Sequence, residues 1–248
     1  MPKIGRQEGS VDVMLRLREA IEFPVRCPGW AKKLAIGGAL SALPALVFTL
    51  LGYVDAVDIL KSSLISAPLG LLYFLIWGYA FYIFRAAYHQ EEPQLLAWGR
   101  WADLFCRGLV IFVIQMAYGL LPLLLMAIGI GVLYRGGWWL FTGLLLLMIG
   151  MLIFLLVAFF FPMGIGQYAR WNRIEAAFYF PSLLRAIRYV LVEYVALFLS
   201  SLAVLLALGF IATIPYLGPV LATFLSFYLA LVSAKLFGEV CGMARGEA

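Results

Sequence analysis

The stretch GWWLFTGLLLLMIGMLIFLLVAFFF, residues 137–161, decides the fold of this chain. It contains no Asp, Glu, Lys, Arg or His, and it is longer than the ~20 residues that a helix needs to cross a hydrocarbon core of about 30 Å. A membrane β-strand alternates apolar and polar residues over about ten positions, whereas this stretch is apolar on every face. The stretch therefore predicts a membrane-spanning α-helix.

The composition of the whole chain agrees with that stretch. Of 248 residues, 65% are hydrophobic and 12% are charged, roughly half the charge of an ordinary globular protein. A soluble domain of this size keeps much of its surface in water, so one core cannot bury this much apolar surface. We expect an all-α membrane protein that forms a single membrane domain over residues 1–248.

Six apolar blocks are long enough to span a bilayer. They cover residues 34–54, 63–84, 108–133, 137–161, 190–214 and 216–235. Gly136 and Gly137 predict a tight turn between the third and fourth blocks, and Pro215 and Pro219 predict one between the last two. We therefore expect six transmembrane helices arranged as three helical hairpins, preceded by a cytoplasmic segment, residues 1–33.

The basic residues predict the orientation. Of the 18 Lys and Arg residues, only Lys61 and Arg135 lie in the connections on one side of the expected bundle, and all others lie on the opposite side. The positive-inside rule places the basic side in the cytoplasm. We expect a multi-pass protein of the cell inner (plasma) membrane with cytoplasmic N- and C-termini.

A short amphipathic helix is expected on the cytoplasmic face before each hairpin, near residues 13–21, 98–105 and 183–187. The unit of one interfacial helix and one hairpin would then occur three times, as an internal repeat. Aromatic and basic residues of this face are candidates for contacts with anionic lipid or with a partner protein. They are Trp30, Lys32, Lys33, Trp98, Arg100, Trp101, Arg107, Arg185 and Arg188.

Residues 22–38 read EFPVRCPGWAKKLAIGG. This stretch resembles the opening of a prokaryotic integral-membrane family catalogued only as a domain of unknown function, whose members share Phe-Pro, a second Pro, a Trp, a Lys and paired glycines. Later features fit the same family: Pro44, Glu91, Glu92, Trp98, Asp103 and the sequence Tyr168-Ala169-Arg170. Cys27 departs from the pattern, since the family tends to have aspartate there. The resemblance covers roughly residues 20–240 and implies the architecture without any chemistry.

Ionisable residues within membrane spans are functional candidates by default. The first four blocks contain none, whereas Glu193 and Lys235 lie near the cytoplasmic ends of the last two. They are a candidate intramembrane polar pair that closes a cytoplasmic cavity, although Glu193 with Arg188, or snorkelling of each side chain to the interface, explains them as well. Gln115 is the most central polar side chain, and we expect it to bridge helices.

No catalytic chemistry is recognisable. His89 is the one histidine, the three cysteines form no CxxC pair, and no HExxH, GxSxG or P-loop motif occurs. Serines in the spans have no neighbouring histidine to activate them. We expect no enzyme, no cofactor and no metal site. Because the basic residues flank apolar blocks instead of forming one run, we also expect no nucleic-acid partner.

These observations favour an accessory or scaffold subunit that docks membrane lipids, a partner protein or a second copy of the chain. Two alternatives stay open. Repeated units and prolines within spans are also compatible with a transporter or channel for an apolar or lipid-like solute. An interfacial lipid-modifying enzyme would use polar residues of the cytoplasmic loop, such as His89, Glu91 or Glu92.

Overall fold

The computed structural model describes residues 7–54, 67–215 and 217–246. Every regular element in these residues is helical, which confirms the all-α class. The α-helices are α1 (Gln7–Arg26), α2 (Trp30–Val54), α4 (Leu72–Tyr88), α5 (Trp101–Leu133), α6 (Trp139–Trp171), α7 (Phe180–Tyr189), α8 (Leu191–Ala212) and α9 (Gly218–Met243). Short 3-10 helices are η1 (Ala67–Leu71), η2 (Ile174–Phe178) and η3 (Ala244–Gly246).

Five helical stretches in the described residues are long and apolar enough to cross a membrane, so the chain is an α-helical membrane protein. These stretches are Pro68–Tyr88, Trp101–Leu133, Trp139–Trp171, Leu191–Ala212 and Gly218–Gly246. The predicted first span, residues 34–54, lies within α2, which is not among them. Residues 55–66, which include the start of the predicted second span, lie outside the described residues.

Several predicted boundaries were wrong, including the end of the last span, since α9 continues beyond residue 235 to Met243. A separate interfacial helix was expected near residues 98–105, but Trp98 lies in an irregular segment and α5 runs without a break from Trp101 to Leu133. No residue between 101 and 108 ends the helix. Gly108 stays helical and lies where α4 crosses α5. In the same way α6 continues beyond residue 161 to Trp171, with Pro162 inside it.

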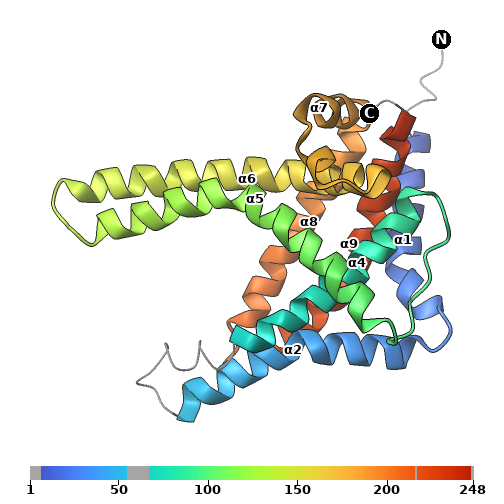
Figure 1. Cartoon of the computed structure of the whole chain (residues 1–248), viewed down its shortest axis with the longest axis horizontal. Helices are drawn as coiled ribbons and strands as arrows, with labels where there is room; N and C mark the ends of the chain where they lie inside the picture. The colour runs from blue at the N-terminus through green and yellow to red at the C-terminus, as the bar shows by residue number, and fades with distance from the viewer. Residues whose placement is uncertain (1–6, 55–66, 216, 247–248) are drawn as a thin grey trace.

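α5 and α6 form the predicted hairpin, and it projects from the rest of the molecule (Figure 1). The turn rests on Gly136 and Gly137, whose φ angles of 66° and 58° favour glycine. α5 bends near its middle in Figure 1. Pro122 is a sufficient cause of the bend, because a proline inside a helix clashes with the carbonyl four residues earlier.

α9 holds together one group of helices. It packs against α2, α4 and α8, and α2 and α4 contact α9 far more than they contact each other. Gly238 and Gly242 let α4 approach α9 closely. A Cβ on Gly238 would lie 2.5 Å from the carbonyl oxygen of Phe84, and a Cβ on Gly242 would lie 2.7 Å from that of Tyr88. The structure thus does not show α2 and α4 as a simple hairpin.

Two cores lie where the helices meet. One contains Tyr88, Ile114, Met163, Tyr194 and Phe237 and joins α4, α5, α6, α8 and α9. The second gathers Phe23, Tyr79, Leu104, Phe227 and Leu231 from α1, α4, α5 and α9.

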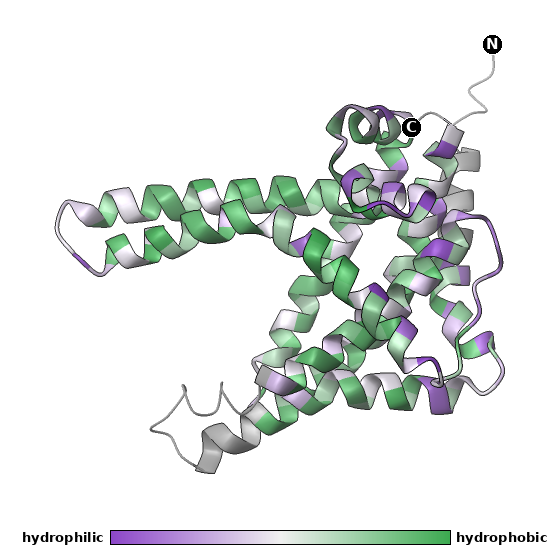
Figure 2. Cartoon of the chain, in the orientation of Figure 1, coloured by the Kyte–Doolittle hydropathy of each residue, from purple (hydrophilic) through white to green (hydrophobic). Residues whose placement is uncertain are grey.

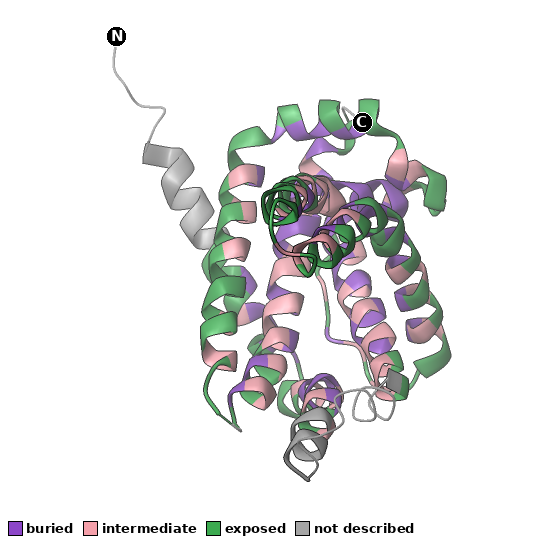
Figure 3. Ribbon diagram, turned by 90° about the vertical axis from the view of Figure 1, so that its left-hand side faces the viewer, coloured by how far each residue is buried: buried purple, intermediate pink, exposed green. Residues whose placement is uncertain are grey.

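Beyond these cores the helices are apolar but uncovered. Figure 2 shows hydrophobic residues along the whole hairpin, and Figure 3, seen from the hairpin tip, shows many of them exposed. In the most apolar stretch of α6, and likewise of α8, only 6% of the residues are buried inside the protein. The accessible surface of 15250 Å² exceeds the ~11,000 Å² of a compact soluble protein of the same mass.

Candidate functional site

The segment between α4 and α5 is fastened to the helices around it by three hydrogen bonds. Lys33 Nζ donates to the Leu95 carbonyl oxygen (2.6 Å) and Trp98 Nε1 to that of Lys33 (2.9 Å). Tyr79 Oη donates to the carbonyl oxygen of Leu96 (3.0 Å). Two candidate interface residues, Lys33 and Trp98, therefore bind backbone of this protein.

Trp98 packs against protein side chains instead of projecting as an anchor. Its ring stacks on Tyr79 with centroids 4.7 Å apart and lies near Trp101 and Phe227. Of these partners Trp101 lies three residues on, whereas Tyr79 and Phe227 come from helices distant in the chain. The interfacial position expected for Trp98 from the sequence stays a prediction.

Other candidate interface residues remain on the surface. Trp30 and Trp101 are 41% and 43% exposed, and Lys32 and Arg100 are exposed. Arg107 is half-buried, and its Nε donates to Asp103 Oδ1 (2.9 Å).

On α1, Glu22 binds Arg18 (2.8 Å) and Arg26. The hydrogen bond from Arg18 is the main cause that lowers the pKa of Glu22 below its ordinary value.

The structure brings Lys235 to Glu239 and not to Glu193. Lys235 Nζ lies 3.5 Å from Glu239 Oε1, one helical turn on, and 5.5 Å from the ring centroid of Phe23. Glu193 is exposed in the first turn of α8. Lys235 and Glu239 line a cavity of about 820 Å³ between α1, α9 and the α4–α5 segment, together with Glu91.

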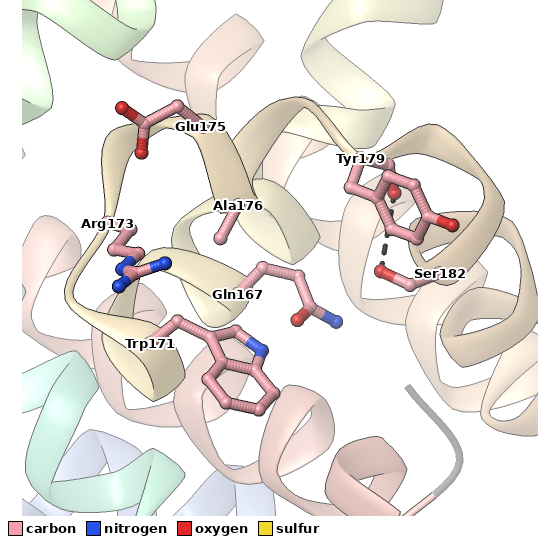
Figure 4. A pocket seen from close by; sticks show the side chains of 7 residues that line it. All are labelled: Gln167, Trp171, Arg173, Glu175, Ala176, Tyr179 and Ser182. Atoms are coloured by element: carbon pink, nitrogen blue, oxygen red, sulfur yellow. Dashed lines mark hydrogen bonds between the residues drawn. The ribbon is translucent and has the colours of Figure 1, made fainter.

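A second cavity of about 760 Å³ lies at the end of α6, and we call it the α6-end cavity (Figure 4). It is lined by Gln167, Trp171, Arg173, Glu175, Ala176, Tyr179 and Ser182. The residues come from the last turns of α6, from η2 and from the start of α7. α6 stops here because Asn172 adopts a left-handed conformation (φ 50°), after which the chain folds back as η2.

Gln167 is the buried polar side chain of the α6-end cavity. It is 3% exposed, and its amide points into the space between Trp171 and Ser182 in Figure 4. No hydrogen bond from this amide to another described side chain or backbone group occurs. Ser182 Oγ donates to the carbonyl oxygen of Tyr179 (3.3 Å), so its oxygen still offers acceptor capacity.

Below this cavity, η2 is held by Tyr118, whose hydroxyl donates to the buried carbonyl oxygen of Ala177. α7 covers the neighbouring core with Leu183, Ala186 and Ile187. Leu184 of the same helix is 44% exposed.

Two of the candidate basic residues, Arg185 and Arg188, lie on the exposed side of α7 and outside the lining of the cavity.

The α6-end cavity was not predicted from the sequence. One available signal was the polar residue Gln167 within an apolar stretch that continues from the predicted fourth span. It was passed over because the expected span ended at residue 161. Gln115, which was expected to bridge helices, is instead exposed on α5.

The described residues contain no group of three or more His, Cys, Asp or Glu that is arranged to hold a metal ion. All three cysteines are free: Cys106 is exposed, and Cys27 and Cys241 are buried.

The chain matches a family described as "Protein of unknown function (DUF4013)" over residues 62–217. This match confirms the resemblance to a family of unknown function, and it lies beyond the opening motif of residues 22–38. No curated protein and no solved structure matches the chain.

Proposed function

This chain belongs to the DUF4013 family of unknown function, and from that premise we propose that it is a non-enzymatic accessory or scaffold subunit of a membrane assembly. Its apolar helices would dock a partner protein or a second copy of the chain, and its basic face would bind anionic lipid. The proposed role is binding, and the described residues contain no group of three or more His, Cys, Asp or Glu that could hold a metal ion.

The observation that carries this proposal is an exposed glutamine on an apolar helix. Gln115 lies on the uncovered side of α5, near Val113 and Met116, which are 46% and 40% exposed. It makes no hydrogen bond to another described residue. In a membrane such an amide gains about 1 kcal/mol from a partner on a neighbouring helix.

The length of the exposed surface supports the same role. α5 and α6 have 33 residues each, or about 50 Å of helix. α8 touches the base of the hairpin, where Tyr194 Oη donates to the carbonyl oxygen of Phe159 (2.6 Å). Beyond this contact α6 and α8 diverge (Figure 1) and both present apolar side chains that a neighbouring subunit or lipid chains would cover.

For the topology, the proposal comprises six spans with α2 as the first, the hairpins α5–α6 and α8–α9, both termini cytoplasmic and the protein in the inner membrane. α1 and α7 would lie in the cytoplasmic interface as amphipathic helices. The exposed thiol of Cys106 tests this orientation. A membrane-impermeant maleimide should label Cys106 in inside-out vesicles and not in intact cells, and labelling of intact cells alone would overturn it.

The function is tested by gentle native purification from the protein's own membranes, followed by mass spectrometry of co-purifying proteins and measurement of oligomeric state. We expect a stoichiometric partner or a homo-oligomer that Gln115→Leu weakens by about fivefold, the equivalent of ~1 kcal/mol. Gln94→Leu is the matched control, because Gln94 is an exposed glutamine outside the apolar helices.

The proposal fails if the purified protein is monomeric without partners and Gln115→Leu changes nothing. A monomer that moves an apolar solute across proteoliposomes would establish the transporter alternative. Lipid turnover that is lost on substitution of His89 would establish the enzyme alternative.

A further inference from the structure

The α6-end cavity has the size of a ligand site. Its volume of about 760 Å³ falls within the range of ~300–1,000 Å³ typical of small-molecule pockets. Its lining combines aromatic rings, an amide, a hydroxyl and two opposite charges (Figure 4).

The buried amide of Gln167 is the first reason to expect a polar ligand. Gln167 is 3% exposed, and its amide has no partner among the described residues. Because no fully buried polar side-chain atom in the described residues lacks a partner, this amide reaches the open space of the cavity. The amide offers two donors and one acceptor oxygen toward the cavity. A bound group with both acceptor and donor atoms would therefore pair with the amide in place of water.

The two charges are the second reason. Arg173 and Glu175 both line the cavity, and neither forms an ion pair with another described residue. An Arg guanidinium binds phosphate through two parallel hydrogen bonds. In Figure 4 the Arg173 guanidinium lies toward Gln167, whereas the Glu175 carboxylate points outward. A ligand that also carries an ammonium group would therefore pair with Arg173 inside the cavity and with Glu175 at its rim.

The aromatic rings are the third reason, because they place the cavity beside an interface. Trp171 and Tyr179 are 57% and 63% exposed at its rim, and Phe180 next to them is 47% exposed. Trp and Tyr of membrane proteins gather at headgroup depth.

We propose that the α6-end cavity binds a zwitterionic headgroup that carries a phosphate and an ammonium group, as in an aminophospholipid. Arg173 binds the phosphate, Glu175 accepts hydrogen bonds from the ammonium, and the Gln167 amide bonds the phosphate ester from below. This inference deepens the proposed lipid docking and rests on it, but it does not depend on a protein partner.

The test is a lipid titration of the delipidated full-length protein in detergent, followed by native mass spectrometry. The probes are phosphatidylethanolamine, phosphatidylglycerol and water-soluble glycerophosphoethanolamine. We expect the wild-type protein to bind phosphatidylethanolamine about tenfold more tightly than phosphatidylglycerol, since one charge-assisted hydrogen bond contributes ~1.5 kcal/mol. Glu175→Gln should abolish this preference, and Arg173→Gln should weaken both lipids.

Gln167→Leu should also weaken the binding of phosphatidylethanolamine about tenfold. Arg188→Gln is the matched control, because Arg188 is an exposed arginine of α7 outside the lining. Arg173 and Glu175 are both exposed, so their variants keep the fold and the test holds even if Gln167→Leu does not fold.

Equal binding of the two lipids by the wild-type protein would overturn the proposal. Equal losses of lipid affinity in Arg173→Gln and Arg188→Gln would overturn it too. Tighter binding of glycerophosphoethanolamine than of the lipid would support the headgroup chemistry and overturn the membrane as its source. If the wild-type protein shows no lipid preference but still associates in a Gln115-dependent way, the headgroup site in the α6-end cavity is refuted and the accessory role is not.

Discussion

The crossing of α4 and α5 leaves no room for a single methyl group. A Cβ on Gly108 would lie 1.7 Å from the carbonyl oxygen of Phe74, and one on Gly78 would lie 1.9 Å from that of Leu104. Real Cβ atoms essentially never approach another atom closer than 3.0 Å. Because both obstacles are helix backbone, Gly108→Ala must push the two helices apart by more than an ångström.

This separation should cost about 2–3 kcal/mol of the free energy of unfolding, near the top of the usual range for an overpacked core. It would loosen the contacts of Phe74 with Phe105 and Phe112, whose ring centroids lie 5.4 and 5.1 Å away. A domain of this size loses about 2–4 °C in melting temperature per kcal/mol. Gly108→Ala should therefore lower the melting temperature by about 4–12 °C.

The assay is thermal unfolding in detergent, read as the loss of monodisperse protein on size exclusion. Gly131→Ala is the matched control in the same helix, because a Cβ on Gly131 meets nothing within 4 Å. It should leave the protein unchanged or stabilise it by up to about 1 kcal/mol. The double variant Gly78→Ala and Gly108→Ala should lose less melting temperature than the sum of the two single variants, since one separation of the helices relieves both clashes. Equal melting temperatures for Gly108→Ala and Gly131→Ala would refute the close crossing.

Three further outcomes are expected. Tyr118→Phe removes the hydrogen bond to the Ala177 carbonyl oxygen and should lower the free energy of unfolding by about 1–2 kcal/mol in the same thermal assay. Tyr189→Phe, at an exposed tyrosine, should leave this free energy unchanged. Equal losses of stability in the two variants would contradict the contact. Trp98→Ala removes the stacking on α4 and should raise protease cleavage between residues 90 and 100 severalfold, and unchanged cleavage would show that the segment is held otherwise. In native protein a maleimide should modify one thiol per chain, Cys106, and all three after denaturation; three modified at once would contradict the buried positions of the other two.

The positions of the long apolar helices were readable along the chain, but several of their ends were not. Residues 137–161 predicted a spanning helix, and residues 139–161 lie within α6, while Gly136 and Gly137 form the predicted turn. Errors arose where apolar sequence continued past the expected limit, as in α6, or where aromatic spacing imitated a helix before it began, as at Trp98.

The candidate sites were harder to predict. The choice of Glu193 as the partner of Lys235 assumed that two charges near the same membrane face meet, whereas Glu239 lies one turn away on the same helix and pairs with Lys235. Gln115 and Gln167 are both single glutamines in apolar sequence. The first lies on an exposed face and the second is buried beside a cavity, and nothing in their flanking residues separates these outcomes.

By itself the sequence determined that the chain is helical, that it belongs in a membrane, and where its hairpin turn falls, because each of these depends on hydropathy and turn chemistry within about twenty neighbouring residues. Only the tertiary structure decided that α2 and α4 pack on α9, that glycines bring α4 and α5 into backbone contact, and that the α6-end cavity forms. In a membrane helix the faces toward lipid and toward protein are equally apolar, so hydropathy carries no signal about which helix each face contacts.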